Sequence, residues 1–230
     1  MKYFKGWNWF EYSFLVVAVV VPVTVGVIAE SGVLEIVTSG IALVAGLLIA
    51  KAKVGGYFVN LVALVLYSIV AYQAGLYGEV GFMYVVTLPI CIYGIVNWLR
   101  NKRVDEAKGE VIKIGHAGLV EIGLLVLSQV VMGFGYYFLL QAFNAEHLII
   151  QTVTLMVSVC AAYLLARRSP LGIVGYIGYD TMQIVLWTLV VVGGSTGAMV
   201  MLAMPICFLI NDAYGTFNWL RLRKNQNKNL

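Results

Sequence analysis

The residues of this sequence that are best suited to chemistry are polar side chains set inside long apolar segments. Asp180 and Asp212 are the carboxylates placed deep within such segments. A buried charge costs free energy unless it is paired, so a carboxylate in apolar surroundings indicates a functional role. Asp180 also belongs to a row of residues spaced three or four apart, which a helix brings to one face. The row consists of Tyr176, Asp180, Gln183 and Trp187.

This face offers aromatic surface, hydrogen-bonding groups and a negative charge, which together suit an aromatic ring joined to a sugar. Tyrosine and tryptophan can stack on the ring, amides can bond the edge of a base, and a carboxylate can bind hydroxyl groups. We therefore expect a substrate site midway along these segments, completed by Gln129, Tyr136, Tyr67, Asn97 and Asn211. The alternative interpretation is structural, because tyrosines and amides also bind helices to one another in apolar surroundings.

Motifs for catalysis are missing from the sequence. It has neither a Walker loop nor an HExxH motif, and its three cysteines lack the paired spacing of a metal site. Two aspartates in apolar segments leave an intramembrane aspartyl enzyme as the alternative from another class. However, Asp212 follows Ile-Asn and lacks the Gly-x-Gly that precedes an aspartate in those proteases. We expect a protein that is not an enzyme and that needs no metal or cofactor.

The elements that must position these residues are membrane-spanning helices. Hydrophobic residues form 61% of the chain and charged residues 11%, and the mean hydropathy is +0.91. Soluble domains have about 45–50% apolar and about 25% charged residues, so the apolar excess here must face lipid. The apolar stretches are too long for the strands of a membrane barrel and are long enough for helices that cross a bilayer. We expect eight such helices, at about 12–29, 33–50, 56–75, 79–99, 117–143, 147–166, 171–192 and 195–219.

The basic residues support this count, because with eight spans all 15 fall on one side of the membrane. The positive-inside rule then predicts a multi-pass protein of the cytoplasmic membrane with both termini in the cytoplasm. The basic end of the chain, RLRKNQNK, is expected to lie against anionic lipid rather than nucleic acid. Five aromatic residues are expected to anchor the helices at the membrane surface: Tyr3, Trp7, Trp9, Trp98 and Trp219.

One apolar phrase occurs twice, as LPICIYGIVNWLR at 88–100 and, with five extra residues, as MPICFLINDAYGTFNWLR at 204–221. The repeat predicts two parallel three-helix bundles joined by a linker helix, with one extra helix at the N-terminus. Pro89 and Pro205 lie at equivalent places and are expected to kink their helices, which suits a hinge or gate. The expected segments are 1–32 (N-terminal helix), 33–100 (first bundle), 101–146 (cytoplasmic loop and linker helix), 147–221 (second bundle) and 222–230 (basic tail).

The stretch AYQAGLYGE at 71–79, followed by LPICIYGIVNW at 88–98, resembles the PnuC family of vitamin and nucleoside transporters. The resemblance covers about residues 33–221 and implies an all-α, SWEET-like transporter. It also implies alternating access and facilitated diffusion of a nucleoside-like substrate, which a cytoplasmic kinase then traps.

The same resemblance leaves the substrate open. Members that carry nicotinamide riboside have a WxxWxxxN motif, and the corresponding residues here are Ile173, Tyr176 and Asp180. A carboxylate could pair with the cationic ring of nicotinamide riboside or with thiamine, or it could bind the hydroxyls of a neutral deoxyribonucleoside. Proton coupling through Asp180 and assembly into a homo-oligomer also stay open.

Overall fold

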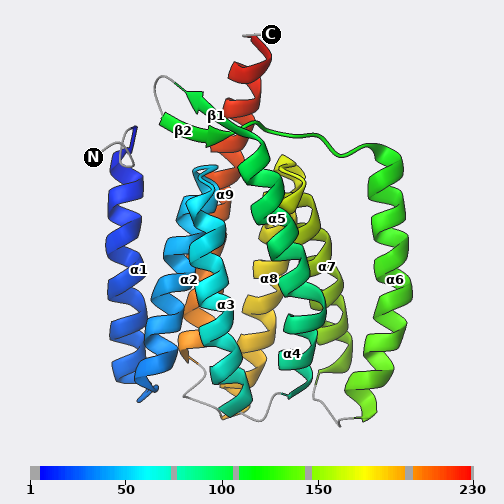
Figure 1. The fold of residues 1–230 in the computed structure, drawn as a ribbon. Coiled ribbons are helices and arrows are strands. Elements are labelled where there is room, and N and C mark those ends of the chain that lie inside the picture. Colours follow the sequence, from blue (N-terminus) through cyan, green and yellow to red (C-terminus); the bar gives the residue numbers. More distant parts are fainter. Residues whose placement is uncertain (1–5, 74–76, 106–108, 143–146, 195–198, 229–230) are drawn as a thin grey trace.

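Eight apolar helical spans form the protein, as the sequence predicts (Figure 1). The structure, a computed structural model, describes residues 6–73, 77–105, 109–142, 147–194 and 199–228. The helices are α1 (Trp9–Ile28), α2 (Val33–Ala50), α3 (Gly55–Gln73), α4 (Tyr77–Phe82), the π-helix η2 (Met83–Thr87), α5 (Leu88–Arg100), α6 (Leu119–Ala142), α7 (Leu148–Ala166), α8 (Pro170–Val192) and α9 (Met199–Lys228). The fourth span is built from α4, η2 and α5 together.

The spans form two similar halves. The first half contains α2, α3 and the α4–α5 span, and the second half contains α7, α8 and α9. The halves meet at two equivalent interfaces, where α2 packs on α9 and α5 packs on α7. In Figure 1, α1 and α6 lie on opposite flanks; α1 packs on α2 and α9, and α6 packs on α7.

The turn between the first and second helix has the same design in both halves. Ala52 and Arg168 adopt left-handed backbone angles, with φ of 57° and 62°. The next helix then begins so close to the previous one that only a glycine fits. A Cβ atom on Gly56 would lie 2.7 Å from the backbone nitrogen of Ile49, and one on Gly172 would lie 2.3 Å from that of Leu165.

The fourth span is interrupted where the sequence predicts a kink. Pro89 lies in the first turn of α5, directly after η2. Because proline has no N–H, it is tolerated at the start of a helix, and the π-helical turn ahead of it takes up the break in bonding. Its counterpart Pro205 lies inside α9.

A β-hairpin lies over one end of the bundle, where the sequence analysis expected only a charged loop. Its antiparallel strands are β1 (Lys102–Asp105) and β2 (Gly109–Ile112). We call this end the basic end; the hairpin lies there, α1 begins there and α9 ends there (Figure 1). Gln226 of α9 binds the chain after the hairpin, since its side chain accepts from Ile114 N (2.9 Å) and donates to Ile112 O (3.0 Å). The helix α9 continues to Lys228, so most of the expected tail 222–230 is the last part of this helix.

The core at the basic end contains Trp98 and Trp219, both fully buried together with Ile112 and Leu222. The expectation that these two tryptophans anchor the protein at the membrane surface is wrong. Both side chains face the opposite half of the protein and not lipid. Trp9, by contrast, has 82% of its surface exposed, which is compatible with the expected role at the lipid surface.

Candidate functional site

The predicted row of polar residues lies on α8. Asp180 is buried, with 2% of its surface exposed, and Tyr176, Gln183 and Trp187 are half-buried. The side chain of Gln183 donates a hydrogen bond of 2.6 Å to the hydroxyl of Tyr179. Tyr179 also meets Tyr176 edge-on, with ring centroids 6.0 Å apart. The row is therefore a polar and aromatic face of α8.

The packing of α8 on α9 brings the two deep carboxylates together. Asp180 lies within electrostatic range of Asp212, and Tyr176 lies within range of both. Asp212 accepts a hydrogen bond of 3.1 Å from the amide of its neighbour Asn211, which is fully buried. Asp212 was absent from the predicted substrate site. Its depth in an apolar segment was the sequence signal that could have added it.

Three buried acceptor atoms of this cluster have no hydrogen-bond partner among the described residues. They are Asp180 Oδ2, Gln183 Oε1 and Asn211 Oδ1. A buried acceptor without a donor costs free energy, and native proteins leave few of them. Because all three are acceptors, the cluster is suited to a ligand that donates hydrogen bonds or carries a positive charge.

Aromatic rings separate this cluster from the basic end. Trp98 meets Tyr57 edge-on at 4.6 Å between centroids, and Trp98 and Trp219 lie 5.5 Å apart. Tyr176 packs against the same group of residues. Asp180 lies ten residues into α8, or about 15 Å from the helix start at 1.5 Å per residue. The cluster is thus deep in the bundle, and packed aromatic rings lie between it and the basic end.

Three other predicted site residues, Gln129, Tyr136 and Asn97, lie apart from this cluster. Gln129 and Tyr136 are on α6, at the flank of the bundle, and α7 lies between α6 and α8. The Gln129 amide lies 3.3 Å from Ser128 Oγ on its own helix. Asn97 is at the basic end, where its amide donates to the carbonyl of Ala166 at 2.8 Å. Tyr67 is half-buried on α3.

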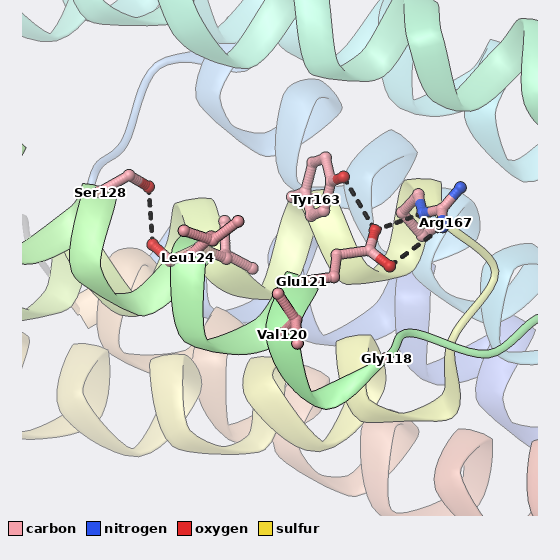
Figure 2. A pocket seen from close by; sticks show the side chains of 8 residues that line it. Gly118, Val120, Glu121, Leu124, Ser128, Tyr163 and Arg167 are labelled. Atoms are coloured by element: carbon pink, nitrogen blue, oxygen red, sulfur yellow. Dashed lines mark hydrogen bonds and ion pairs between the residues drawn. The ribbon is translucent and has the colours of Figure 1, made fainter.

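A second polar site opens between α6 and α7 at the basic end (Figure 2). It is a pocket of about 780 Å³, and none of the predicted substrate residues lines it. Arg167 binds Glu121 through two hydrogen bonds of 2.6 and 3.0 Å, and the Tyr163 hydroxyl donates to Glu121 at 2.9 Å. No group of three or more His, Cys, Asp or Glu side chains that could hold a metal ion occurs in the described part of the chain.

Comparison with known proteins agrees with this architecture. Residues 32–221 match the sequence model of a family described as nicotinamide mononucleotide transporter. The chain belongs to this family. The family region covers both halves and α6, and leaves α1 outside.

Members of the family from two bacteria resemble the chain over nearly its whole length. The nicotinamide riboside transporter PnuC of Neisseria mucosa is 27% identical over 223 residues, which are 96% of this chain and 84% of the relative. That of Haemophilus influenzae is 25% identical over 228 residues, or 98% and 96%. The crystal structure of a vitamin B3 transporter PnuC superposes with a TM-score of 0.78 at 26% identity, covering 96% of this chain and 94% of that one. The predicted resemblance to PnuC is confirmed, and the chain is a multi-pass membrane transporter.

Proposed function

We propose that this transporter carries a nucleoside-like compound with a cationic aromatic base, with nicotinamide riboside as the first candidate. The observation that supports this substrate class is the cluster of unpartnered acceptors around the paired acids Asp180 and Asp212. Two carboxylates in one apolar site repel each other, and either a proton on one of them or a cation bound between them relieves that repulsion. The relatives named above are nicotinamide riboside transporters, and the base of that compound is a cation.

The remaining groups of the cluster suit the other parts of such a molecule. Tyr176 and Trp187 each offer a ring on which a flat base can stack, and the face of an aromatic ring also favours a cation. They lie eleven residues apart on α8, or about 16 Å along the helix, so the base would stack on one of them at a time. Gln183 Oε1 and Asn211 Oδ1 can accept hydrogen bonds from ribose hydroxyls. The proposed site is therefore Tyr176, Asp180, Gln183, Trp187, Asn211 and Asp212.

Thiamine is the second candidate, since it is also a cationic aromatic compound. Ile173 and Tyr176 stand where riboside carriers of this family have tryptophans. Ile173 is buried in the core around Trp98 and Trp219, where it is covered by protein. The ring that binds here therefore meets a different aromatic surface from the one in those relatives.

A binding experiment distinguishes cationic from neutral substrates. Isothermal titration of purified protein should compare nicotinamide riboside, thiamine and thymidine. Loss of a hydrogen bond to a charged group costs about 1.5–3 kcal/mol, or about ten- to a hundredfold in affinity. Asp180→Asn should weaken binding of the cations by this factor and of thymidine by less. Val185→Ala, on an exposed part of the same helix, is the control and should bind like the parent. Equal affinities of parent and Asp180→Asn for both cations would refute the proposed site.

Facilitated diffusion with alternating access is the transport mode that we propose, with the basic end in the cytoplasm and with Pro89 and Pro205 as hinges. A kinase in the cytoplasm would then make uptake one-way. Uptake into proteoliposomes should equilibrate the substrate without an ion gradient. Uptake that collapses when a pH gradient is removed would contradict this mode.

A further inference from the structure

The repeated Asn-Trp pair connects the two halves by equivalent hydrogen bonds. In the first half, Asn97 and Trp98 of α5 donate to the last carbonyls of α7; in the second half, Asn218 and Trp219 of α9 donate to the last carbonyls of α2. The bonds are Asn97 to Ala166 (2.8 Å), Trp98 to Leu165 (3.1 Å), Asn218 to Ala50 (2.8 Å) and Trp219 to Ile49 (3.1 Å). The two asparagines bond the last carbonyl of each helix, and the two indoles are second donors to Leu165 O and Ile49 O, which also accept from Arg168 N and Ala52 N. Each half therefore helps to cap a helix of the other.

The equivalence extends to the flanking helices. A cation follows each capped helix, Lys51 after α2 and Arg167 after α7. Each cation binds a glutamate of the helix that comes before the capped helix in the chain. Lys51 pairs with Glu11 of α1, and Arg167 pairs with Glu121 of α6. With respect to these contacts, α1 therefore occupies the place in the first half that α6 occupies in the second. The helix α1 lies outside residues 32–221, which are the part of the chain that matches the family model.

The two sides nevertheless differ in burial. The side chains of Lys51 and Glu11 are only 5% and 3% exposed, whereas those of Arg167 and Glu121 are 35% and 25% exposed. The pocket between α6 and α7 is what leaves the second pair open (Figure 2). An exposed ion pair contributes little to stability, whereas separating a buried pair leaves a charge without a partner.

The two tyrosines of the repeated phrase, Tyr214 and Tyr93, also differ in how strongly they are held by neighbouring helices. Tyr214 of α9 crosses to α1, where its hydroxyl donates to Glu11 at 2.5 Å and its ring lies 4.5 Å from that of Phe10. Its equivalent on α5 is Tyr93, which stacks on Tyr163 of α7 at 6.4 Å and interacts with Arg167. Tyr93 is 40% exposed. The α2–α9 side is thus buried and bonded through α1, whereas the α5–α7 side is less covered by the rest of the protein.

We infer that the basic end opens by separation of α5 from α7, while α2, α9 and α1 stay together as the fixed side. In a symmetric transporter the α2–α9 and α5–α7 interfaces would open with equal ease. Here α1 covers the α2–α9 interface, so the motion is confined to the α5–α7 interface. Tyr93 and Arg167 are then gating residues, Glu121 of α6 positions Arg167, and α1 acts as the fixed support of the gate.

Cys91 is a natural reporter of this opening. It is 3% exposed, and it packs in the core with Trp98 and Trp219, on the substrate side of Trp98 along α5. A background with Cys160→Ala and Cys207→Ala leaves it as the one thiol. Membrane vesicles that expose the basic end are treated with an impermeant maleimide, and the rate of Cys91 labelling is measured. This readout needs no substrate, so it stays informative if the proposed substrate class is wrong.

The equivalent tyrosines supply a matched pair of variants. Tyr93→Phe removes the hydroxyl at Arg167 and should raise the labelling rate severalfold. Tyr214→Phe removes the hydroxyl at Glu11 and should leave the rate unchanged. Glu121→Gln removes the α6 carboxylate that holds Arg167, the partner of Tyr93, and should act like Tyr93→Phe. The inference is overturned if Tyr214→Phe raises labelling as much as Tyr93→Phe, or if neither Tyr93→Phe nor Glu121→Gln raises it.

Cross-linking tests the motion directly. Tyr93→Cys with Tyr163→Cys spans the α5–α7 side, and Phe10→Cys with Tyr214→Cys spans the fixed side. A short bifunctional thiol reagent across the first pair should abolish Cys91 labelling and stop transport in proteoliposomes. The same reagent across the second pair should leave both intact. Loss of labelling with the second cross-link, or persistence with the first, would show that the gate lies elsewhere.

Discussion

The rings of Trp98 and Trp219 lie 5.5 Å apart, and each indole N–H donates to a carbonyl of the opposite half at 3.1 Å. The two tryptophans come from the two copies of the repeated phrase. They meet between the halves, which explains why the chain contains the phrase twice. The repeat forms the joint that holds the two bundles together at the basic end.

Removal of either indole donor should destabilise the protein measurably. Trp98→Phe or Trp219→Phe removes one of two donors to a buried carbonyl, because Leu165 O also accepts from Arg168 N and Ile49 O also accepts from Ala52 N. The lost hydrogen bond should cost about 0.5–1.5 kcal/mol in the free energy of unfolding, and the smaller buried ring adds to that cost. Thermal unfolding in detergent should show a clear fall in Tm for both. Trp9→Phe is the control, since Trp9 is exposed, and its effect should stay within about 0.5 kcal/mol.

The two equivalent glutamates should differ in their contribution to stability. Glu11→Gln leaves the buried Lys51 without its counter-charge, which costs about 3–5 kcal/mol. Glu121→Gln affects a pair that is partly exposed, so its cost should be at most about 1 kcal/mol. The same thermal assay compares them. Equal losses would mean that the difference in burial has no energetic consequence.

Lys51 predicts how stability depends on pH. Burial lowers the pKa of its amine from the usual 10.5, and the hydrogen bond and charge of Glu11 oppose this. The unfolded chain therefore holds this proton to higher pH than the folded protein does, so stability rises with pH as the alkaline range below 10.5 is crossed. In Glu11→Gln the carboxylate no longer raises the pKa of Lys51, so the rise in stability should begin at lower pH. The difference in Tm between parent and variant should thus shrink from neutral pH to about pH 10; a constant difference would contradict this.

Much of the fold could be predicted from the sequence because membrane helices have a strong signal. A bilayer sets the length of each span, and placing all lysines and arginines on one side supported the count, so eight spans followed from length and charge. The hairpin was missed because its strands, KRVD and GEVI, are four residues each and carry charges typical of a loop.

The site was predictable only in part. The spacing predicts that Tyr176, Asp180 and Gln183 share one face of α8, because helical periodicity is local. The depth of Asp212 was visible in the sequence, but its approach to Asp180 depends on how α8 packs against α9, which the sequence does not specify. Trp98 was misinterpreted for the same reason. An aromatic residue at the end of a span looks alike whether it faces lipid or another helix.

The orientation of the protein in the membrane can be tested with two matched valines. Val33 at the start of α2 and Val104 in the hairpin are 78% and 77% exposed. With the basic end in the cytoplasm, an impermeant maleimide added to intact cells should label Val33→Cys. It should reach Val104→Cys only after the cells are permeabilised. The parent, whose native cysteines lie within helices, gives the background. The opposite pattern would reverse the proposed topology.

The final prediction concerns the energetic coupling of Asp180 and Asp212 in binding. If both carboxylates contact one cation, removing the first relieves their mutual repulsion and makes the second a better partner. Each single change to asparagine should therefore cost less binding free energy than the lost contact alone would, because the remaining carboxylate binds the cation better. The double variant should lose about 1 kcal/mol more than the sum of the two, within the range usual for residues in contact. Isothermal titration with nicotinamide riboside or thiamine measures this cycle.

The control combines Asp180→Asn with Glu110→Gln in the exposed hairpin. The losses of binding free energy from these two changes should be additive within about 0.5 kcal/mol. Additive losses for the two aspartates would mean that they do not share one ligand charge, and the proposed cation site would then have to be built on Asp180 alone.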